Sequence, residues 1–316
     1  MLTVDAALDR LTHSLAAAKR LGADSADAIY VGDGSTGIGV RMGVLEDIGR
    51  SEGEEVGLRV FVGQRSASVS SSDLSVDALQ QAVERAVAMA REAPEDAYAG
   101  LAPAELLMRE TPRDLDIDDG GEISAETLKE MALAAEDAAR AVAGVTNSEG
   151  GSASSGRAVM ALATSTGFAR GYHGTSYGVS ASVIAGEGTG MQRDYAYHSS
   201  RHASDLETPE SIGLRAGTRA VRRLNPIKLD TQSLPVVFDP RVGGGMLSAL
   251  IGAITGGSIA RKTSFLLEAL GTQVFAPGIR IIDQPHRLRG LRSKPFDGEG
   301  LPTAERAIID DGVLTG

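Results

Sequence analysis

The chain has 316 residues, 42% hydrophobic and 23% charged, which is enough for one large domain or two to three modest ones. Its 31 basic and 42 acidic side chains give a net charge of −11, which disfavours nucleic acid and anionic membranes as partners. The absence of cysteine excludes disulfides, zinc–thiolate sites and thiol nucleophiles, and it fits a reducing cytoplasm. Because no apolar run reaches membrane-spanning length and the N-terminus does not resemble a signal peptide, we expect a soluble cytoplasmic protein.

The first part of the chain predicts a helix, a set of antiparallel strands and a second helix. Apolar residues recur at helical spacing from Val4 to Ala18, behind Thr3 as N-cap. From residue 28 to 71, apolar and polar residues alternate between glycine-containing turns, which is typical of a β-meander. A further helical pattern follows, with Ser75 as its cap.

The same order of elements recurs after a proline-containing acidic stretch. Residues 96–123 suit an exposed connector. A helix is then expected over 124–142, a β-rich stretch over 145–188, and a helix over 208–223 that begins with Thr208 and Pro209. The simplest interpretation of this recurrence is one sheet shared by both parts.

The last part of the chain predicts the start of another domain. The stretch "LPVVFDP" has the composition of a short buried strand, and "AERAIIDDGVLTG" combines a strand, an Asp-Gly turn and the start of a returning strand. A domain rarely ends on half a hairpin, so a fragment is expected. The fold class is therefore α+β, with largely antiparallel sheets flanked by helices in repeated helix–meander–helix units. The predicted domains are 1–95 (N-terminal), 124–228 (central) and 229–316 (start of a truncated C-terminal domain).

The glycine-rich stretch 239–257, "DPRVGGGMLSALIGAITGG", is a poor match to phosphate-binding loops. It has no lysine at the position that a P-loop requires, and no third glycine where the dinucleotide fingerprint needs one. The favoured alternative is a helix that starts after a flexible turn and packs closely through Gly252 and Ala253. Its apolar residues between Met246 and Ile254 share one broad side, which predicts a packed helix.

Several stretches resemble, in their shared order, the TldD/PmbA family, which is also called the modulator-of-DNA-gyrase family. The stretches "GVRMGVLEDI" and "EEVGLRVFVGQRSASVSSSDLS" resemble its N-terminal domain, and "ALATSTGFARGYHGT" resembles its central domain. The part from "PVVFDP" onward resembles its C-terminal domain, including "SIARKTSFLLEALGTQVFAPGIRIIDQP" and "GLRSKPFDGEGLPT". The resemblance covers nearly the whole chain and is closer to the PmbA (TldE) side of the family.

The resemblance also locates a catalytic helix whose ligands this chain lacks. In TldD subunits, a His-Glu-x-x-x-His helix in the region that corresponds to residues 245–252 binds the metal of a peptidase. Two imidazoles about one turn apart can face one ion, and the carboxylate between them can activate its water. Here the stretch reads "GMLSALIG", without His or Glu. The resemblance therefore implies no metal, no cofactor and no catalytic residue in this chain, with zinc in a TldD-like partner.

Five residues are candidates for contact with a substrate or a partner. The expected helix offers Met246 and Leu250 on its apolar side. The loop "IIDQPHRLRGLRSKPFDGEG" offers Asp283, Asp297 and Glu299 near Gly and Pro turns, a composition suited to converging side chains. An ordinary solvated loop is the competing interpretation, and for catalysis it is the favoured one.

Three other patterns give weaker signals. His198 and His202 are four residues apart, but alternating tyrosines beside them favour a strand or loop, so we expect an exposed pair and no metal site. No Gly-x-Ser-x-Gly elbow of a serine hydrolase occurs. A basic cluster without interleaved aromatic residues predicts surface salt bridges in preference to nucleic-acid binding; it comprises Arg287, Arg289, Arg292 and Lys294.

By resemblance, the sequence predicts the non-catalytic, PmbA/TldE-like subunit of a heteromeric TldD/PmbA metallopeptidase. Such an enzyme acts on unfolded or small peptides and is associated with the maturation of peptide antibiotics. The expected partners are a TldD-like subunit and a peptide, with no membrane and no nucleic acid. Two alternatives stay open: an independent metal-dependent hydrolase that uses Asp283, Asp297 or Glu299, and a regulatory binding module linked to DNA gyrase.

Overall fold

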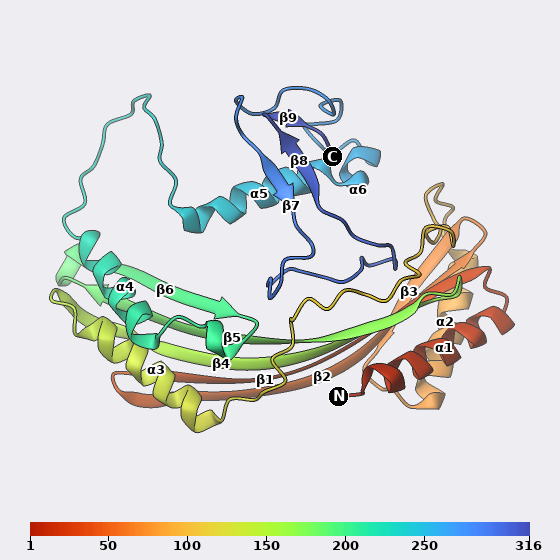
Figure 1. Cartoon of the computed structure of the whole chain (residues 1–316), viewed down its shortest axis with the longest axis horizontal. Helices are drawn as coiled ribbons and strands as arrows, with labels where there is room; N and C mark the ends of the chain where they lie inside the picture. Colours follow the sequence, from red (N-terminus) through yellow and green to blue (C-terminus); the bar gives the residue numbers. More distant parts are fainter. The chain divides into compact units, whose positions relative to one another are not determined.

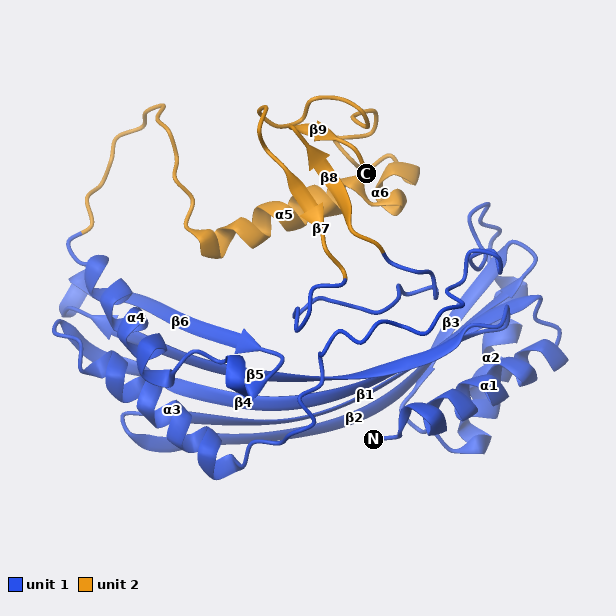
Figure 2. Cartoon of the chain, in the orientation of Figure 1, with its two compact units in different colours: residues 1–225, 286–303 blue, residues 226–285, 304–316 orange.

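The computed structural model describes all residues, 1–316, and the chain divides into two compact units. The first unit comprises residues 1–225 and 286–303, and the second comprises residues 226–285 and 304–316 (Figure 2). A six-stranded sheet forms the first unit and a three-stranded sheet lies in the second, which confirms the predicted α+β class. None of the helices has the length and apolar character needed to span a bilayer.

The six-stranded sheet joins the two predicted meanders. Its strand order is β3-β2-β1-β4-β5-β6, and every neighbouring pair is antiparallel (Figure 1). Because β1 pairs with β4 along most of its length, the predicted shared sheet is confirmed. The domain limits expected at residues 95, 123 and 228 are a separate matter and stay a prediction. The strands are β1 (Ser25–Arg41), β2 (Val44–Val62), β3 (Arg65–Ser71), β4 (Val145–Thr164), β5 (Ala169–Ala185) and β6 (Gln192–Ser200).

Two pairs of helices belong to the first unit. Each helix begins at a Ser or Thr whose side chain accepts a backbone N–H of the first turn, which confirms the predicted caps at Thr3, Ser75 and Thr208. Short 3₁₀ turns occur at Gly188–Gly190 and Ala203–Asp205. The helices are α1 (Val4–Arg20), α2 (Val76–Glu92), α3 (Ala125–Arg140) and α4 (Pro209–Arg222).

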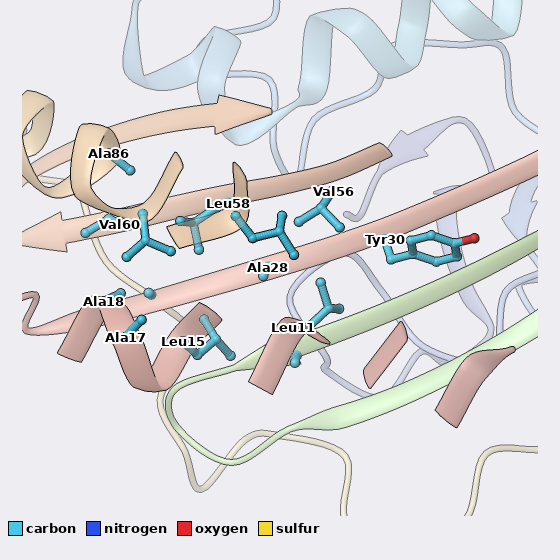
Figure 3. Packing of buried hydrophobic residues seen from close by; sticks show 14 of the residues in the cluster. Leu11, Leu15, Ala17, Ala18, Ala28, Tyr30, Val56, Leu58, Val60 and Ala86 are labelled. Atoms are coloured by element: carbon cyan, nitrogen blue, oxygen red, sulfur yellow. The ribbon is translucent and has the colours of Figure 1, made fainter. Parts of the chain in front are cut away.

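Both helix pairs cover the same face of the sheet, at opposite ends of the long strands. Alternate residues of a strand point to one face. Ala28 and Tyr30 of β1 pack with Leu11 of α1 in one cluster (Figure 3). Further along the same face, Ile38 and Val40 pack with α3 and α4 in a second cluster. The helices therefore leave the other face of the sheet uncovered.

Two irregular segments pack on that other face. Leu107 and Phe296, from segments 93–123 and 286–303, are buried with Leu162 and Phe168 of the sheet region. Leu115 and Ile117 are buried as well, so the prediction of an exposed connector is wrong at these positions. The reason is that this segment carries apolar residues, Leu107 among them, that pack against the sheet face that the helices leave free.

The second unit has a small core of its own. Leu250 of its longest helix packs with Ile308, Ile309 and Leu314 of the C-terminal hairpin. Positive φ at Asp311 and Gly312 forms the turn of that hairpin, which confirms the predicted Asp-Gly turn. The elements are α5 (Pro240–Ile254), α6 (Gly256–Ala260), β7 (Ile281–Asp283), β8 (Arg306–Asp310) and β9 (Val313–Leu314).

Three expectations about the second unit are wrong, the third of them only in part. Residues 234–239 form no strand, and Val237 is 96% exposed, because no neighbouring strand supplies hydrogen bonds there. The helix α5 already begins at Pro240 with Asp239 as its cap, so the run of three glycines lies within the helix and forms no turn. A Cβ added at Gly252 would meet no other atom within 4 Å, so the predicted close packing does not occur at that glycine, whereas Ala253 is buried as expected.

The helix α5 is packed on only one side. Leu250 is 7% exposed, whereas Met246, Leu247 and Ile251 are 53%, 44% and 49% exposed. The prediction of a packed helix therefore holds for Leu250 and for Ile254, which packs against the same small core, and is wrong for the other three residues. The small core formed by the hairpin is too narrow to cover the broad apolar side that periodicity indicates.

Candidate functional site

A pocket of about 580 Å³ lies on the face of the six-stranded sheet that the helices leave free. Strands β1, β2, β3 and β4 form its floor, and the loop around Gly298 lines it as well. All of its lining residues belong to the first unit. They are Asp27, Ala28, Ile29, Gly57, Leu58, Arg59, Ser68, Val69, Ser70, Leu162, Gly298 and Glu299.

An ion pair between neighbouring strands is the main charged feature of this pocket. Asp27 of β1 and Arg59 of β2 are directly opposite in the sheet register. The guanidinium donates Nε–H to Asp27 Oδ1 at 2.9 Å and Nη2–H to Oδ2 at 2.7 Å. It also lies 5.2 Å from the ring centroid of Phe61. The hydrogen bonds to Asp27 are the main reason that the pKa of Arg59 is raised, so a fixed cation lies in the floor.

A second carboxylate approaches the same guanidinium from the loop. Glu299 Oε1 lies 3.5 Å from Arg59 Nη2, a longer contact than those of Asp27. Asp297 shapes this turn, because its Oδ1 accepts the N–H groups of Glu299 and Leu301 at 2.9 and 2.8 Å. Phe296 anchors the loop and is 1% exposed. The loop therefore holds Glu299 beside the pocket.

The chemistry of the pocket suits binding. It combines one guanidinium and two carboxylates with the hydroxyls of Ser68 and Ser70 and with apolar surface from Ile29 and Leu162. Such a mixture can contact both polar and apolar groups of a polypeptide. No His or Cys lines the pocket, so it contains no pair of nucleophile and imidazole base.

A buried histidine lies between two carboxylates elsewhere in the first unit. His202 is 8% exposed, its Nε2 lies 3.1 Å from Asp116 Oδ1, and its Nδ1 lies 3.3 Å from Asp119 Oδ1. The Thr175 N–H donates to the Ile117 carbonyl at 2.9 Å, which holds the segment with both aspartates beside β5. The prediction of an exposed histidine pair is therefore wrong for His202, because a distant segment covers it.

The loop 286–303 is joined to this cluster through one member of the basic group. Arg289 donates Nε–H to Asp116 at 2.6 Å and Nη1–H to Asp205 at 3.0 Å. The hydrogen bond from Arg289 is the main reason that the pKa of Asp116 is lowered. At Arg289 the predicted surface salt bridging is confirmed.

The five candidate residues from the sequence fall in both units. Met246 is exposed on α5, Leu250 is buried in the core of the second unit, and Asp283 pairs with Arg306 at 3.6 Å. Asp297 and Glu299 belong to the first unit. The structure brings only these last two together, and the contact roles of all five stay predictions.

Sequence reasoning missed the two residues that carry the charge of the pocket floor. Asp27 and Arg59 are each an isolated charge within a strand whose neighbours are mostly apolar. A charged side chain among apolar residues of a strand indicates that it has a partner of opposite charge, because charged residues are rarely buried without one. Their partnership could not be recognised, because it depends on the register between β1 and β2.

The side chains of α5 do not fit a metal ion. Residues 245–252 offer no imidazole, carboxylate or thiolate, the donor groups that zinc binds in proteins. In residues 1–316 the structure contains no group of three or more His, Cys, Asp or Glu side chains that could hold a metal ion.

Comparison with known proteins places this chain in a class of metallopeptidases. Three family models match consecutive parts of the chain: PmbA/TldA metallopeptidase domain 1 at residues 26–90, the central domain at 118–224 and the C-terminal domain at 231–316. The metalloprotease PmbA of Escherichia coli O157:H7 is 40% identical over 316 residues, which are 99% of this chain and 70% of that protein. The chain belongs to the PmbA/TldD metallopeptidase family.

Other relatives agree with this assignment. A metalloprotease PmbA homolog of Haemophilus influenzae is 37% identical over 88% of this chain and 61% of its own length. A solved structure from Bacteroides thetaiotaomicron, described as a modulator of DNA gyrase, has a TM-score of 0.92 and 25% identity, and covers 100% of this chain and 72% of that chain. TldE from Thermococcus kodakarensis shares the fold with a TM-score of 0.80 at 17% identity, over 97% of this chain and 69% of that chain. This chain thus spans about two thirds of the length of such relatives.

Proposed function

We propose that this chain is the non-catalytic, PmbA/TldE-like subunit of a heteromeric TldD/PmbA peptidase in the cytoplasm. The observation that carries the proposal is the composition of α5, the helix that by resemblance corresponds to the metal-binding helix of TldD subunits. Its residues 245–252 have no side chain that zinc could use. The zinc and the chemistry of hydrolysis then belong to a TldD-like partner, and the absence of cysteine fits the cytoplasm.

The role of this chain is to hold unfolded or small peptides, including precursors of peptide antibiotics. The pocket around Arg59 supports this role, since it combines an ion-paired guanidinium and its carboxylates with hydroxyl and apolar groups on the sheet face that the helices leave free. A flexible peptide can use such groups together along its length. The loop of Asp297 and Glu299 contributes an acidic group to the same pocket.

Co-expression with the TldD-like protein of the same organism tests the proposal. We expect a complex by size-exclusion chromatography that cleaves an unfolded polypeptide, whereas this chain alone shows little cleavage. Elemental analysis should find zinc in the complex and no stoichiometric zinc in the isolated chain. About one zinc per isolated chain, retained after mild chelation, together with cleavage by that chain, would overturn the proposal.

Substitutions in the loop test the substrate-guiding role. Glu299→Ala and Asp297→Ala should lower the activity of the complex modestly and leave the zinc content of the partner unchanged. Asp297→Asn retains an oxygen that can accept the two loop N–H groups and serves as the matched control for loop geometry. Glu95→Ala removes an exposed acid of the same unit outside the pocket and should have no effect. Equal activity of the complexes with Glu299→Ala and Glu95→Ala would show that Glu299 in the pocket does not contribute to substrate binding.

A further inference from the structure

Two rows of side chains that run across the strands form the floor of the pocket on the six-stranded sheet. In the first, the charged row, Arg59 of β2 lies opposite Asp27 of β1 and opposite Ser68 of β3. Asp27 accepts one hydrogen bond from Arg59 at each carboxylate oxygen, and its side chain is 10% exposed. The charges of this pair therefore neutralise each other within the floor.

The second row, the apolar row, lies two residues away on each strand. Ile29 of β1 is opposite Leu162 of β4 and Gly57 of β2, and Gly57 is opposite Ser70 of β3. Residues two apart on a strand point to the same face, so the two rows run side by side, about 6.6 Å apart. Gly57 has no side chain, and a Cβ at this position would lie only 3.2 Å from Ile29 Cγ2. The pocket is therefore open between Ile29 and Ser70.

The acidic group of the loop 286–303 is the least engaged charge of the pocket. The side chain of Glu299 is 44% exposed, and its Oε1 has one contact, at 3.5 Å to Arg59 Nη2, in which Oε2 takes no part. Asp297 Oδ1 accepts the backbone N–H of Glu299 and so fixes its position in the turn. Ser68 and Ser70 are exposed in the same pocket. A carboxylate oxygen and two hydroxyls can therefore accept hydrogen bonds from a ligand.

The charge of the pocket favours a cationic ligand group. The lining residues carry one positive and two negative charges, a net charge of −1. An ammonium or guanidinium group of a ligand would bring this charge to zero. A ligand carboxylate would bring it to −2 and would compete with Asp27 and Glu299 for the one guanidinium, that of Arg59. Because charges in a partly buried site are screened less than exposed ones, the sign of the ligand charge should affect affinity.

We infer that this pocket holds a basic side chain, lysine or arginine, of the bound peptide, with its charged head at Glu299 and its stem on the apolar row. The inference rests on the proposed peptide-holding function of the chain. Long basic side chains cover apolar surface with their methylene groups while the head keeps polar partners. The spacing of about 6.6 Å between the rows is close to the length of an extended lysine side chain. Ile29 and Leu162 then contact the stem, while Glu299 and Ser68 accept hydrogen bonds from the head.

Binding of peptides that differ at one position tests the inference without a partner or a metal. The probes are unfolded peptides of Gly, Ser and Ala with one central lysine, norleucine or glutamate, acetylated and amidated so that only this side chain is charged. Fluorescence anisotropy with the isolated chain measures the Kd of each. The lysine peptide should bind roughly fivefold tighter than the norleucine peptide, because one partly exposed ion pair is added, and the glutamate peptide should bind weakest. About 0.5 M salt should reduce these differences.

Two variants of Glu299 and one control assign the preference to this pocket. Glu299→Gln should remove the preference for lysine over norleucine, and Glu299→Lys should make the glutamate peptide the tightest ligand. Glu95→Gln removes the same charge from the chain outside the pocket and should keep the preference for lysine. The side chains of Glu299 and Glu95 are 44% and 68% exposed, so these changes should preserve the fold, which thermal melting checks.

Four results contradict the inference. They are equal Kd values for lysine and norleucine, tightest binding of glutamate, the same loss of preference in Glu299→Gln and Glu95→Gln, and no measurable binding of any of the three peptides. If one of them occurs while the complex with a TldD-like subunit cleaves an unfolded polypeptide, only the inference fails and the proposed function stands. A preference for lysine in a chain that forms no active complex contradicts the proposed function instead.

Discussion

The carboxylate of Glu136 in α3 accepts a hydrogen bond at 2.9 Å from the backbone N–H of Gly43, in the turn between β1 and β2. A second N–H, from Met42, donates to the same carboxylate at 2.7 Å. Both turn residues have positive φ, as a two-residue hairpin turn of this type requires. Burial opposes the charged form of Glu136, but hydrogen bonds from Ser148 and from the turn outweigh it and lower the pKa. A buried acid thus fixes the hairpin against the helix.

Glu136→Ala should reduce the free energy of unfolding by about 2–4 kcal/mol, because the turn loses two charge-assisted hydrogen bonds to this carboxylate. Glu136→Gln keeps one acceptor oxygen and should lose less. Because the folded pKa is lowered, the contribution of Glu136 is present above the unfolded pKa of about 4.3 and is lost as the pH falls through the folded pKa. Urea unfolding of the three proteins at neutral and acidic pH measures both effects. Identical midpoints at neutral pH would show that the turn does not depend on this acid.

Leu250→Asp should destabilise the second unit by about 3 kcal/mol or more, because it buries a carboxylate without a partner among apolar side chains. Leu247→Asp is the matched control on the same helix, since Leu247 is 44% exposed and the new charge would remain in water. Limited proteolysis of the second unit during thermal unfolding reports the difference. Equal protection of both variants would contradict the one-sided packing of α5.

The contributions of Asp27 and Arg59 to the free energy of unfolding should depend on each other. Arg59→Met leaves the largely buried carboxylate of Asp27 without its two hydrogen bonds and should cost about 1–3 kcal/mol. Adding Asp27→Asn removes the unpaired negative charge and should recover part of the lost stability. A double-mutant cycle by denaturant unfolding measures the coupling, and additive losses would indicate that the two side chains act independently.

The hydroxyl of Tyr30 should make stability fall at alkaline pH. It donates to Glu54 Oε1 at 2.6 Å and accepts the N–H of Leu2 at 2.8 Å. Burial, with the hydrogen bond to Glu54, raises its pKa to about 12. Because the unfolded pKa is about 10, the contribution is complete below that value and is lost as the pH rises through the folded pKa.

Comparison with Tyr30→Phe isolates this effect from other alkaline titrations. The difference in unfolding free energy between the two proteins should be constant at neutral pH and should shrink between about pH 10 and 12. A difference that does not change over this range would contradict the raised pKa.

Local sequence signals were sufficient for the helices and strands of the first unit. Thr3, Ser75 and Thr208 precede apolar residues at helical spacing, and a capping side chain satisfies free N–H groups within its own first turn. Alternating apolar residues in the two β-rich stretches produced strands for a similar local reason, since one face of each had to be buried. The recurrence of these patterns was enough to predict a shared sheet.

The pairing of residues distant in the chain was decided only by the tertiary structure. The sequence around His202 indicates an exposed residue, but segment 114–121 covers it and supplies two carboxylates. Asp27 and Arg59 meet because of a strand register, and a shift of one residue would place them on opposite faces. The periodicity of α5 specifies which side is apolar, whereas the few side chains of the C-terminal hairpin decide that Leu250 is covered and Met246 is exposed. Burial and pairing depend on the surfaces that folding brings together, and these surfaces come from parts of the chain that no local pattern connects.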